Sequence, residues 1–237
     1  MRALCFVLAA AAVASLPAAD LGNVPPLLSG TEIFARLVEH NRKQDRLLRG
    51  YSVSRTYSAE NNAGKVYARE EVRMSYDPAG EKSFQLISGY GSWLVRDLVF
   101  SRLREAEITA ARGPDRTQSS ITPGNYRFDA AGTGEIAGRP CYIVRVTPLH
   151  KNKYLFEGRV WIDAAEFAIA QIDGHPAANP SFWTRHVEFV RSYAKVGDFW
   201  LPSRDATVAD IRLYGRKTLT IVHYNYILEP GETLSSR

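Results

Sequence analysis

The sequence predicts a mainly β protein, in which one large, curved antiparallel sheet is covered by two helices. The first observation is that β-branched and aromatic residues alternate with polar ones in Cys141 to Val146 and again in Gly158 to Asp163. This period of two is typical of strands with one buried face. The second is that polar turns, Lys151 to Lys153 and Asp163 to Glu166, join these runs to each other and to the next one. Together they predict a meander of strands.

Two stretches have the spacing of an amphipathic helix instead. The first runs from Gly30 to Arg49, where Ser29 and Glu32 form a candidate capping box and Gly50 stands where a helix would end. The second lies between Ser92 and Ala111 and is inserted between predicted strands. Its apolar residues at helical spacing are Leu94, Val95, Leu98, Val99, Leu103 and Ala106.

The remaining strand-like runs bring the expected total to about ten to twelve strands. These runs are Tyr51 to Tyr57, Val66 to Tyr76, Lys82 to Ser88, Tyr126 to Ala130, Glu135 to Ile136, Phe167 to Ile172, Arg185 to Ala194, Phe199 to Leu201, Ser203 to Tyr214 and Lys217 to Leu228. The glycines from Gly132 to Gly138 predict two turns around a short strand. Pro202 predicts an edge or a bend, because proline cannot donate a hydrogen bond to a central ladder. Arg112 to Gly124 is rich in turn-forming residues and is predicted to be a loop.

The N-terminus has the pattern of a signal peptide, with basic Arg2, an apolar run from Leu4 to Ala14 and small residues after it. The run is too short to cross a bilayer as a helix, which takes about 20 residues, and Cys5 precedes it, where it is misplaced for lipidation. We therefore expect a signal peptide over 1–19, a linker over 20–29, one domain over 30–230 and a frayed tail over 231–237. The exported protein would be periplasmic, either soluble or peripheral to a membrane.

Composition argues against several functional classes. The formal net charge is +5. The sequence has no Lys/Arg cluster interleaved with stacking aromatics, so nucleic acid is not an expected partner. Without the signal peptide, Cys141 is the single remaining cysteine, and we expect it to be a buried apolar residue. The five histidines are scattered, no serine-nucleophile motif is present, and acidic residues fall mostly at turns or on outward positions. The sequence therefore predicts a protein that is not an enzyme and has no catalytic residues, metal or cofactor.

Aromatic residues concentrate in or beside the predicted sheet, and two interpretations remain open. They form an ordinary core under two helices, or some of them line an open apolar cavity of the kind that binds ligands. The candidate cavity residues are Trp93, Trp161, Phe182, Trp183, Phe189 and Trp200, and the candidate polar rim is Arg73, Arg96 and Lys153. The loop from His175 to Trp183 holds two prolines and two adjacent aromatics, so it is a candidate flap at the cavity mouth.

The order of elements resembles a known family. A signal peptide, the helix from Gly30 to Arg49, long strands from Tyr51 to Tyr76, an inserted helix and a meander to the C-terminus resemble the periplasmic lipoprotein carriers and their relatives, including lipid-sensing regulators of the envelope stress response. The segments GRVWID and KVGDFWLP are similar to exported outer-membrane lipoprotein-sorting proteins. The resemblance implies a half-open antiparallel barrel, with helices as a lid over a cavity that holds acyl chains. Where the carriers place an arginine before a proline to engage the lid, this chain has Asp77.

The expected function is therefore that of a periplasmic carrier, which binds a lipid or the acyl chains of a lipoprotein and moves it between membranes without chemistry. Burial of acyl chains would supply the affinity, and a few polar residues at the rim would supply specificity. Membrane-bound transport components are the expected partners besides the cargo. The alternative is an envelope sensor or interaction scaffold whose half-barrel is filled by its own aromatics.

Overall fold

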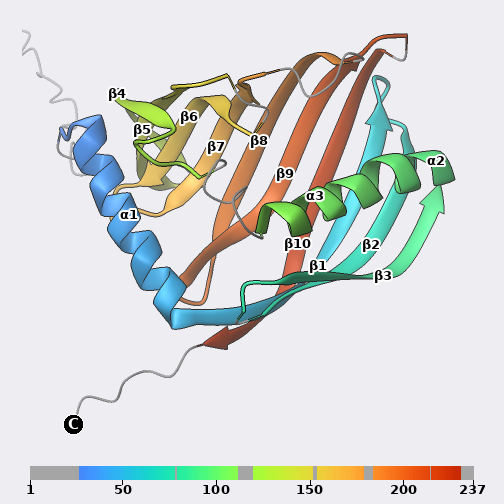
Figure 1. Cartoon of the computed structure of the whole chain (residues 1–237), viewed down its shortest axis with the longest axis horizontal. Coiled ribbons are helices and arrows are strands. Elements are labelled where there is room, and N and C mark those ends of the chain that lie inside the picture. The colour runs from blue at the N-terminus through green and yellow to red at the C-terminus, as the bar shows by residue number, and fades with distance from the viewer. Residues whose placement is uncertain are drawn as a thin grey trace, which may run out of the picture.

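The protein is an open antiparallel half-barrel with its helices on the concave face (Figure 1). The computed structural model describes residues 27–77, 79–111, 120–151, 154–178, 184–213 and 215–230. Within these residues ten strands form one sheet in the order β3-β2-β1-β10-β9-β8-β7-β6-β5-β4. β3 and β4 are the two edges, so the sheet does not close into a barrel. The predicted fold class is confirmed.

The elements have the following bounds. The helical elements are α1 (Gly30–Leu47), α2 (Trp93–Val95), the π-helical η1 (Arg96–Ser101) and α3 (Arg102–Ala111). The strands are β1 (Leu48–Asn61), β2 (Val66–Tyr76), β3 (Lys82–Gly91), β4 (Tyr126–Ile136), β5 (Arg139–Pro148), β6 (Phe156–Asp163), β7 (Ile169–Pro176), β8 (Thr184–Val196), β9 (Phe199–Ile211) and β10 (Gly215–Pro230). We call α2, η1 and α3 together the second helical segment.

The N-terminus of α1 is fixed by the predicted capping box. The Ser29 Oγ accepts a hydrogen bond from the Glu32 backbone N–H at 3.2 Å, and the Glu32 carboxylate accepts one from the Ser29 N–H at 2.9 Å. The helix ends at Leu47, so Gly50 is not its stop signal but part of β1. A Cβ at Gly50 would lie 2.8 Å from the Tyr76 carbonyl oxygen, so the close approach of β2 explains the glycine.

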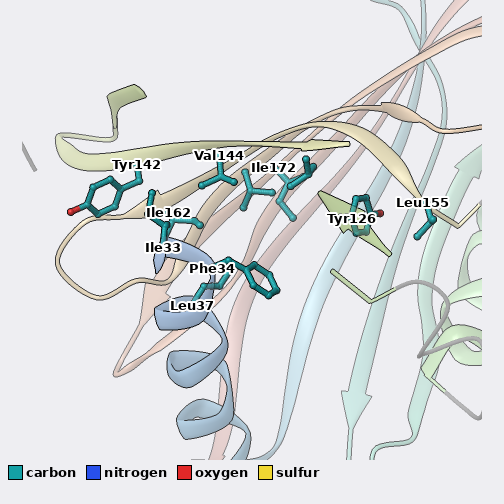
Figure 2. Close-up of a cluster of buried hydrophobic side chains, with 11 residues drawn as sticks. Ile33, Phe34, Leu37, Tyr126, Tyr142, Val144, Leu155, Ile162 and Ile172 are labelled. Atoms are coloured by element: carbon teal, nitrogen blue, oxygen red, sulfur yellow. The ribbon is translucent and has the colours of Figure 1, made fainter. Parts of the chain in front are cut away.

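The apolar face of α1 builds the larger core cluster at the β4 end of the sheet. Ile33, Phe34 and Leu37 point from α1 toward the strands (Figure 2). The Phe34 ring stacks on Phe128 of β4 with 4.0 Å between ring centroids. The strand residues that share this cluster are Tyr126, Tyr142, Val144, Val146, Val160, Ile162 and Ile172, together with Leu155. The predicted burial of Cys141 is confirmed, because its side chain is fully buried on β5.

The second helical segment crosses the opposite end of the concave face, over β1 to β3 (Figure 1). Phe100 is fully buried, with its ring centroid 5.6 Å from that of Tyr57 on β1. Ala59, Ala68 and Val72 complete this smaller cluster. The predicted second helix is therefore confirmed, and a π-helical stretch in its middle is a feature that the sequence pattern does not reveal.

Two strand predictions need correction. The glycine-rich stretch is not a pair of turns around a short strand, because β4 runs unbroken from Tyr126 to Ile136 with a β-bulge between Ala130 and Gly132. Gly132 accommodates the bulge with a φ of 114°, a backbone conformation that suits glycine. Likewise, β9 continues through Pro202 instead of dividing there. The pairing of β9 with β10 stops at Arg204, so Pro202 has a ladder partner only on β8, as expected for a local edge.

Candidate binding site

A hollow of about 670 Å³ lies on the concave face, between the cluster under α1 and the second helical segment. We call it the apolar hollow. Its size is within the range of roughly 300–1,000 Å³ that is common for small-molecule sites. The apolar residues that line it include Leu103, Ile121, Leu155, Phe156, Ile169, Ile172, Phe189, Leu219 and Ile221. The polar ones are Tyr154, Arg191, Tyr193, Asp205 and Thr207. A mostly apolar wall with a few polar groups is the usual composition of a ligand site.

The hollow exists because the two helical elements cover the two ends of the sheet and leave the middle strands without a helix. α1 contacts β4 and β5, and the second helical segment contacts β2 and β3. Inward-facing residues of β8, β9 and β10 therefore line the hollow between the two covered ends. Thr207 marks the centre of this floor, since it pairs with Phe189 of β8 and with Leu219 of β10.

A row of charged and polar side chains crosses the same concave floor. Arg55 of β1 is directly opposite His223 of β10, and Asp205 of β9 is directly opposite Arg191 of β8. The Arg191 Nε–H donates to one Asp205 oxygen, and the His223 Nε2 lies 2.8 Å from the other. We call these four residues, with Glu107 and Lys82, the polar row.

The row is electrostatically coupled. Burial raises the pKa of Asp205, but the hydrogen bond from His223 and the charge of Arg191 outweigh it and bring that pKa down to about 2. Burial is the main cause of the lowered pKa of His223, and the nearby Arg55 and Arg191 charges act in the same direction against the opposing effect of Asp205. At neutral pH, Asp205 is therefore ionised and His223 is neutral.

The polar row also ties the second helical segment to the sheet. The Glu107 carboxylate of α3 accepts two hydrogen bonds from the Arg55 guanidinium, at 2.7 and 3.1 Å, and one from the Lys82 ammonium at 2.7 Å. Burial opposes ionisation of Glu107, but these bonds and charges lower its pKa to about 2. Arg104 forms a further ion pair with the buried Glu70 at 2.6 Å.

This geometry predicts a loss of stability in acid. The folded pKa of Glu107 is about 2 against an ordinary 4.5, so its contribution is complete above pH 4.5 and disappears as the pH falls toward about 2. Between about pH 6 and pH 2, urea unfolding should lose about 3 kcal/mol of unfolding free energy through this carboxyl. Asp205 and His223 act in the same direction, because both have lowered pKa values in the folded state.

The Glu107→Gln variant provides the test. We expect it to be less stable at neutral pH, because Arg55 loses its anionic partner, and to have a shallower decline in unfolding free energy between about pH 6 and pH 2. Glu105→Gln is the matched control, since Glu105 lies on the same helix with 67% of its side chain exposed. An acid slope in Glu107→Gln as steep as in the control would contradict the predicted role of Glu107.

A second hollow of about 540 Å³ lies near the C-terminal end of α1. Gln44, Tyr51, Tyr76, Lys82 and Trp200 are among its lining residues. Burial raises the pKa of Tyr51 to about 12. The lining of this second hollow is more polar than that of the apolar hollow, which makes it the weaker candidate for an apolar ligand.

An apolar stripe runs along the outer side of the second helical segment. The exposed fractions of Leu94, Leu98, Val99 and Leu103 are 49%, 51%, 40% and 36%. Leu103 also lines the apolar hollow, so the stripe leads from the outside of the helix to the hollow. Such a concentration of exposed apolar side chains on one element is characteristic of interaction or ligand-entry surfaces.

The aromatic residues predicted to line the cavity lie in different places in the structure. Phe189 lines the apolar hollow and Trp200 lines the second one, where its indole N–H donates to Glu166 at 3.1 Å. Trp161 lies between the core residues Val160 and Ile162 on β6, so it points to the opposite face, where its indole N–H bonds Asp173 at 2.6 Å. Trp93 is 68% exposed at the start of α2.

The remaining candidates have different locations. Arg73 is exposed on β2, next in sequence to the buried Val72 and Met74, and therefore faces away from the concave side. Arg96 begins η1, and its guanidinium lies against Gly89 of β3. Phe182, Trp183 and Lys153 lie outside the described residues, as does the C-terminal half of the predicted flap, residues 179–183. A role of any of these residues in ligand binding stays a prediction.

Sequence reasoning missed the polar row. The expectation that carboxylates lie at turns or on outward positions is wrong for Asp205 and Glu70, which lie on the concave face. A signal was present, because Arg191 alternates in phase with Phe189 and Tyr193 along β8. A charged residue on the apolar face of a strand needs a partner, but the partner on β9 is not visible in the local pattern.

In the part of the chain that the structure describes, no cluster of three or more His, Cys, Asp or Glu side chains could hold a metal ion. No described helix combines the length and the apolar character that crossing a membrane requires.

The described residues thus form an open half-barrel with an apolar hollow between its two helical elements. Comparison with family models matches residues 104–167 to the MucB/RseB N-terminal domain. This match confirms the predicted resemblance to lipoprotein carrier-like proteins and their envelope-stress relatives. A comparison with curated proteins finds no match.

Among solved structures, the chain is similar to a putative outer membrane lipoprotein-sorting protein domain from Vibrio parahaemolyticus, with 14% identity, a TM-score of 0.46, and coverage of 86% of this chain and 94% of that one. A DUF1329 family protein from Desulfovibrio piger has 14% identity and a TM-score of 0.44, with coverage of 86% and 95%. A LolA superfamily protein from Nitrosomonas europaea has 9% identity and a TM-score of 0.41, with coverage of 86% and 94%.

Proposed function

We propose that the protein is an exported, periplasmic carrier that holds a lipid or the acyl chains of a lipoprotein in the apolar hollow. The observation that carries this proposal is the hollow itself. Aliphatic and aromatic side chains line it from β7, β8, β10 and the connection between β5 and β6. Each methylene group moved from water into such a site contributes about 0.8 kcal/mol. A chain of ordinary length therefore supplies enough affinity without a large set of polar contacts.

The apolar stripe supports an entry route for the cargo. Leu94 and Leu98 are half exposed on the outside of the second helical segment, and Leu103 continues the same surface into the hollow. An acyl chain leaving a membrane or a partner protein would cross this apolar surface and not the polar row. The signal peptide predicted at the N-terminus supports the periplasmic location.

The electrostatics of the polar row support a binding protein without catalysis. A general acid or base works best when its pKa is near the working pH. Asp205 and Glu107 instead have pKa values of about 2 and make ion pairs with neighbouring cations. Their arrangement stabilises the ionised state and holds the second helical segment in place.

A second candidate function is an envelope sensor or interaction scaffold. It is favoured by the apolar side chains of β3, the edge strand, and of α2, where Leu86, Ile87 and Tyr90 are more than half exposed and Trp93 is 68% exposed. An unpaired sheet edge beside such side chains is suited to contact with another protein. In this alternative the hollow would have no cargo.

Competition with a fluorescent apolar dye tests the proposed function. The mature protein should bind the dye, and long-chain amphiphiles should displace it with a saturable, stoichiometric curve. A chain shortened by two methylene groups should bind about tenfold more weakly, because about 1.6 kcal/mol of burial is lost. Dye binding that no amphiphile displaces would contradict the carrier and favour the scaffold.

A further inference from the structure

We propose that the apolar hollow takes an amphiphile with an anionic head, a carboxylate or a phosphate, and that Arg191 binds that head. This inference rests on the proposed function and specifies its ligand class. Arg191 and Asp205 are the charged side chains among the described residues that line the hollow. The two lie opposite each other on β8 and β9, the strands between the two helical elements (Figure 1).

Arg191 is both anchored and accessible. Its Nε–H donates to Asp205, yet 50% of its side chain is exposed, and it is one of the residues that line the hollow. A guanidinium carries four further N–H groups on its two terminal nitrogens. Two parallel bonds from these nitrogens are the usual way in which arginine recognises a carboxylate or a phosphate.

The neighbours of Arg191 hold it in position. Asp205 is bound on its other oxygen by His223, whose side chain is only 2% exposed, and Arg191 is bound in turn by Asp205. The Tyr193 hydroxyl neighbours the same guanidinium from two residues further along β8. A positioned guanidinium loses little conformational freedom when it binds an anion, and this favours recognition.

One bound anion would neutralise the net charge of the polar row. The cations are Arg55, Lys82 and Arg191, the carboxylates are Glu107 and Asp205, and the row therefore has one positive charge in excess when His223 is neutral. Glu107 is bound by both Arg55 and Lys82 at the far side of the row. An anionic head at Arg191 would balance this charge.

The apolar wall begins directly beside the cation. Phe189 lies two residues before Arg191 on the same face of β8, and Ile169 and Ile172 of β7 line the hollow next to it. A ligand with its head on Arg191 can therefore place its chain along these side chains. Head and chain then occupy adjoining parts of one site, which matches the chemistry of an anionic amphiphile.

The test compares heads on the same chain. Dye displacement is measured with palmitate, with a monopalmitoyl phosphate ester and with monopalmitoylglycerol, which is neutral. The wild-type protein should bind the two anionic probes about tenfold more tightly than the neutral one, the effect expected of one charge-assisted hydrogen-bonded contact. Which anionic probe binds more tightly distinguishes a carboxylate from a phosphate head.

Arg191→Gln should remove most of this preference while leaving the neutral probe bound as before. Arg204→Gln is the matched control, because Arg204 is exposed next to Asp205 on β9 and its side chain lines a different surface. Equal binding of all three probes by the wild type, or a preference that survives in Arg191→Gln, would overturn the inference and leave the carrier standing. Failure of every probe, the neutral one included, would overturn both.

Discussion

Thr207→Trp is expected to abolish most binding of long-chain amphiphiles. Thr207 lies at the centre of the floor of the apolar hollow, opposite Phe189 on one side and Leu219 on the other. An indole there occupies space that acyl chains would fill. If the indole displaces about three methylene groups of the ligand, about 2.4 kcal/mol of binding free energy is lost. The dissociation constant in the dye-displacement assay should then be about 50-fold higher.

The control for this variant is Val208→Trp, the same substitution one residue further along β9. Side chains of successive strand residues point to opposite faces, so this indole lies on the outside of the sheet. Val208→Trp should bind amphiphiles as the wild type does. A folded Thr207→Trp protein with unchanged affinity would contradict the assignment of the hollow as the binding site.

Phe100→Ala is expected to have the largest effect on stability. Phe100 is the one described residue of the second helical segment that is fully buried, and it packs from η1 onto Tyr57 of the sheet. Truncation of a fully buried phenylalanine typically costs about 3–5 kcal/mol, because transfer free energy is lost and a cavity remains. Urea unfolding monitored by circular dichroism would measure the difference.

Leu98→Ala is the matched comparison, since Leu98 is 51% exposed on the same π-helical stretch. Its unfolding free energy should change by no more than about 0.5 kcal/mol, as is usual for exposed positions. If Phe100→Ala were as stable as Leu98→Ala, the second helical segment would not depend on this contact for its place on the sheet.

Local patterns were sufficient to predict most of the fold. The capping box at Ser29 and Glu32 determines where α1 begins, because both of its hydrogen bonds join residues three positions apart. The period of two in β5 and β6 has the same local origin, as does the polar turn after Asp163. Contacts of this kind are present in the sequence itself, so they can be read without the structure.

Features that depend on distant segments could not be predicted. The local pattern around Gly50 predicts a helix stop, but the reason for this glycine is the close approach of the Tyr76 carbonyl on the next strand. The residue type of Trp161 suggests a place in the cavity, whereas the phase of β6 puts its side chain on the opposite face. Pro202 fits within β9 because the pairing of β9 with β10 stops at Arg204, and the local sequence does not reveal where that pairing stops.

The candidate site was the least predictable part, because its charged members are far apart in sequence. Arg55, Glu107 and Arg191 come from β1, α3 and β8, and only the curvature of the sheet brings them to one floor. Of the four aromatic candidates among the described residues, Phe189 is the one that lines the apolar hollow. Aromatic content thus indicated that a site of this kind could exist without indicating its position.

Native mass spectrometry of the protein, purified from its native host, tests the carrier proposal most directly. Solvent extraction of the same sample would then identify any bound molecule. The account predicts a stoichiometric additional mass that belongs to an amphiphile with at least one long acyl chain. A clean mass of the protein alone, unchanged after incubation with a membrane extract, would contradict the carrier and leave the interaction scaffold as the better description.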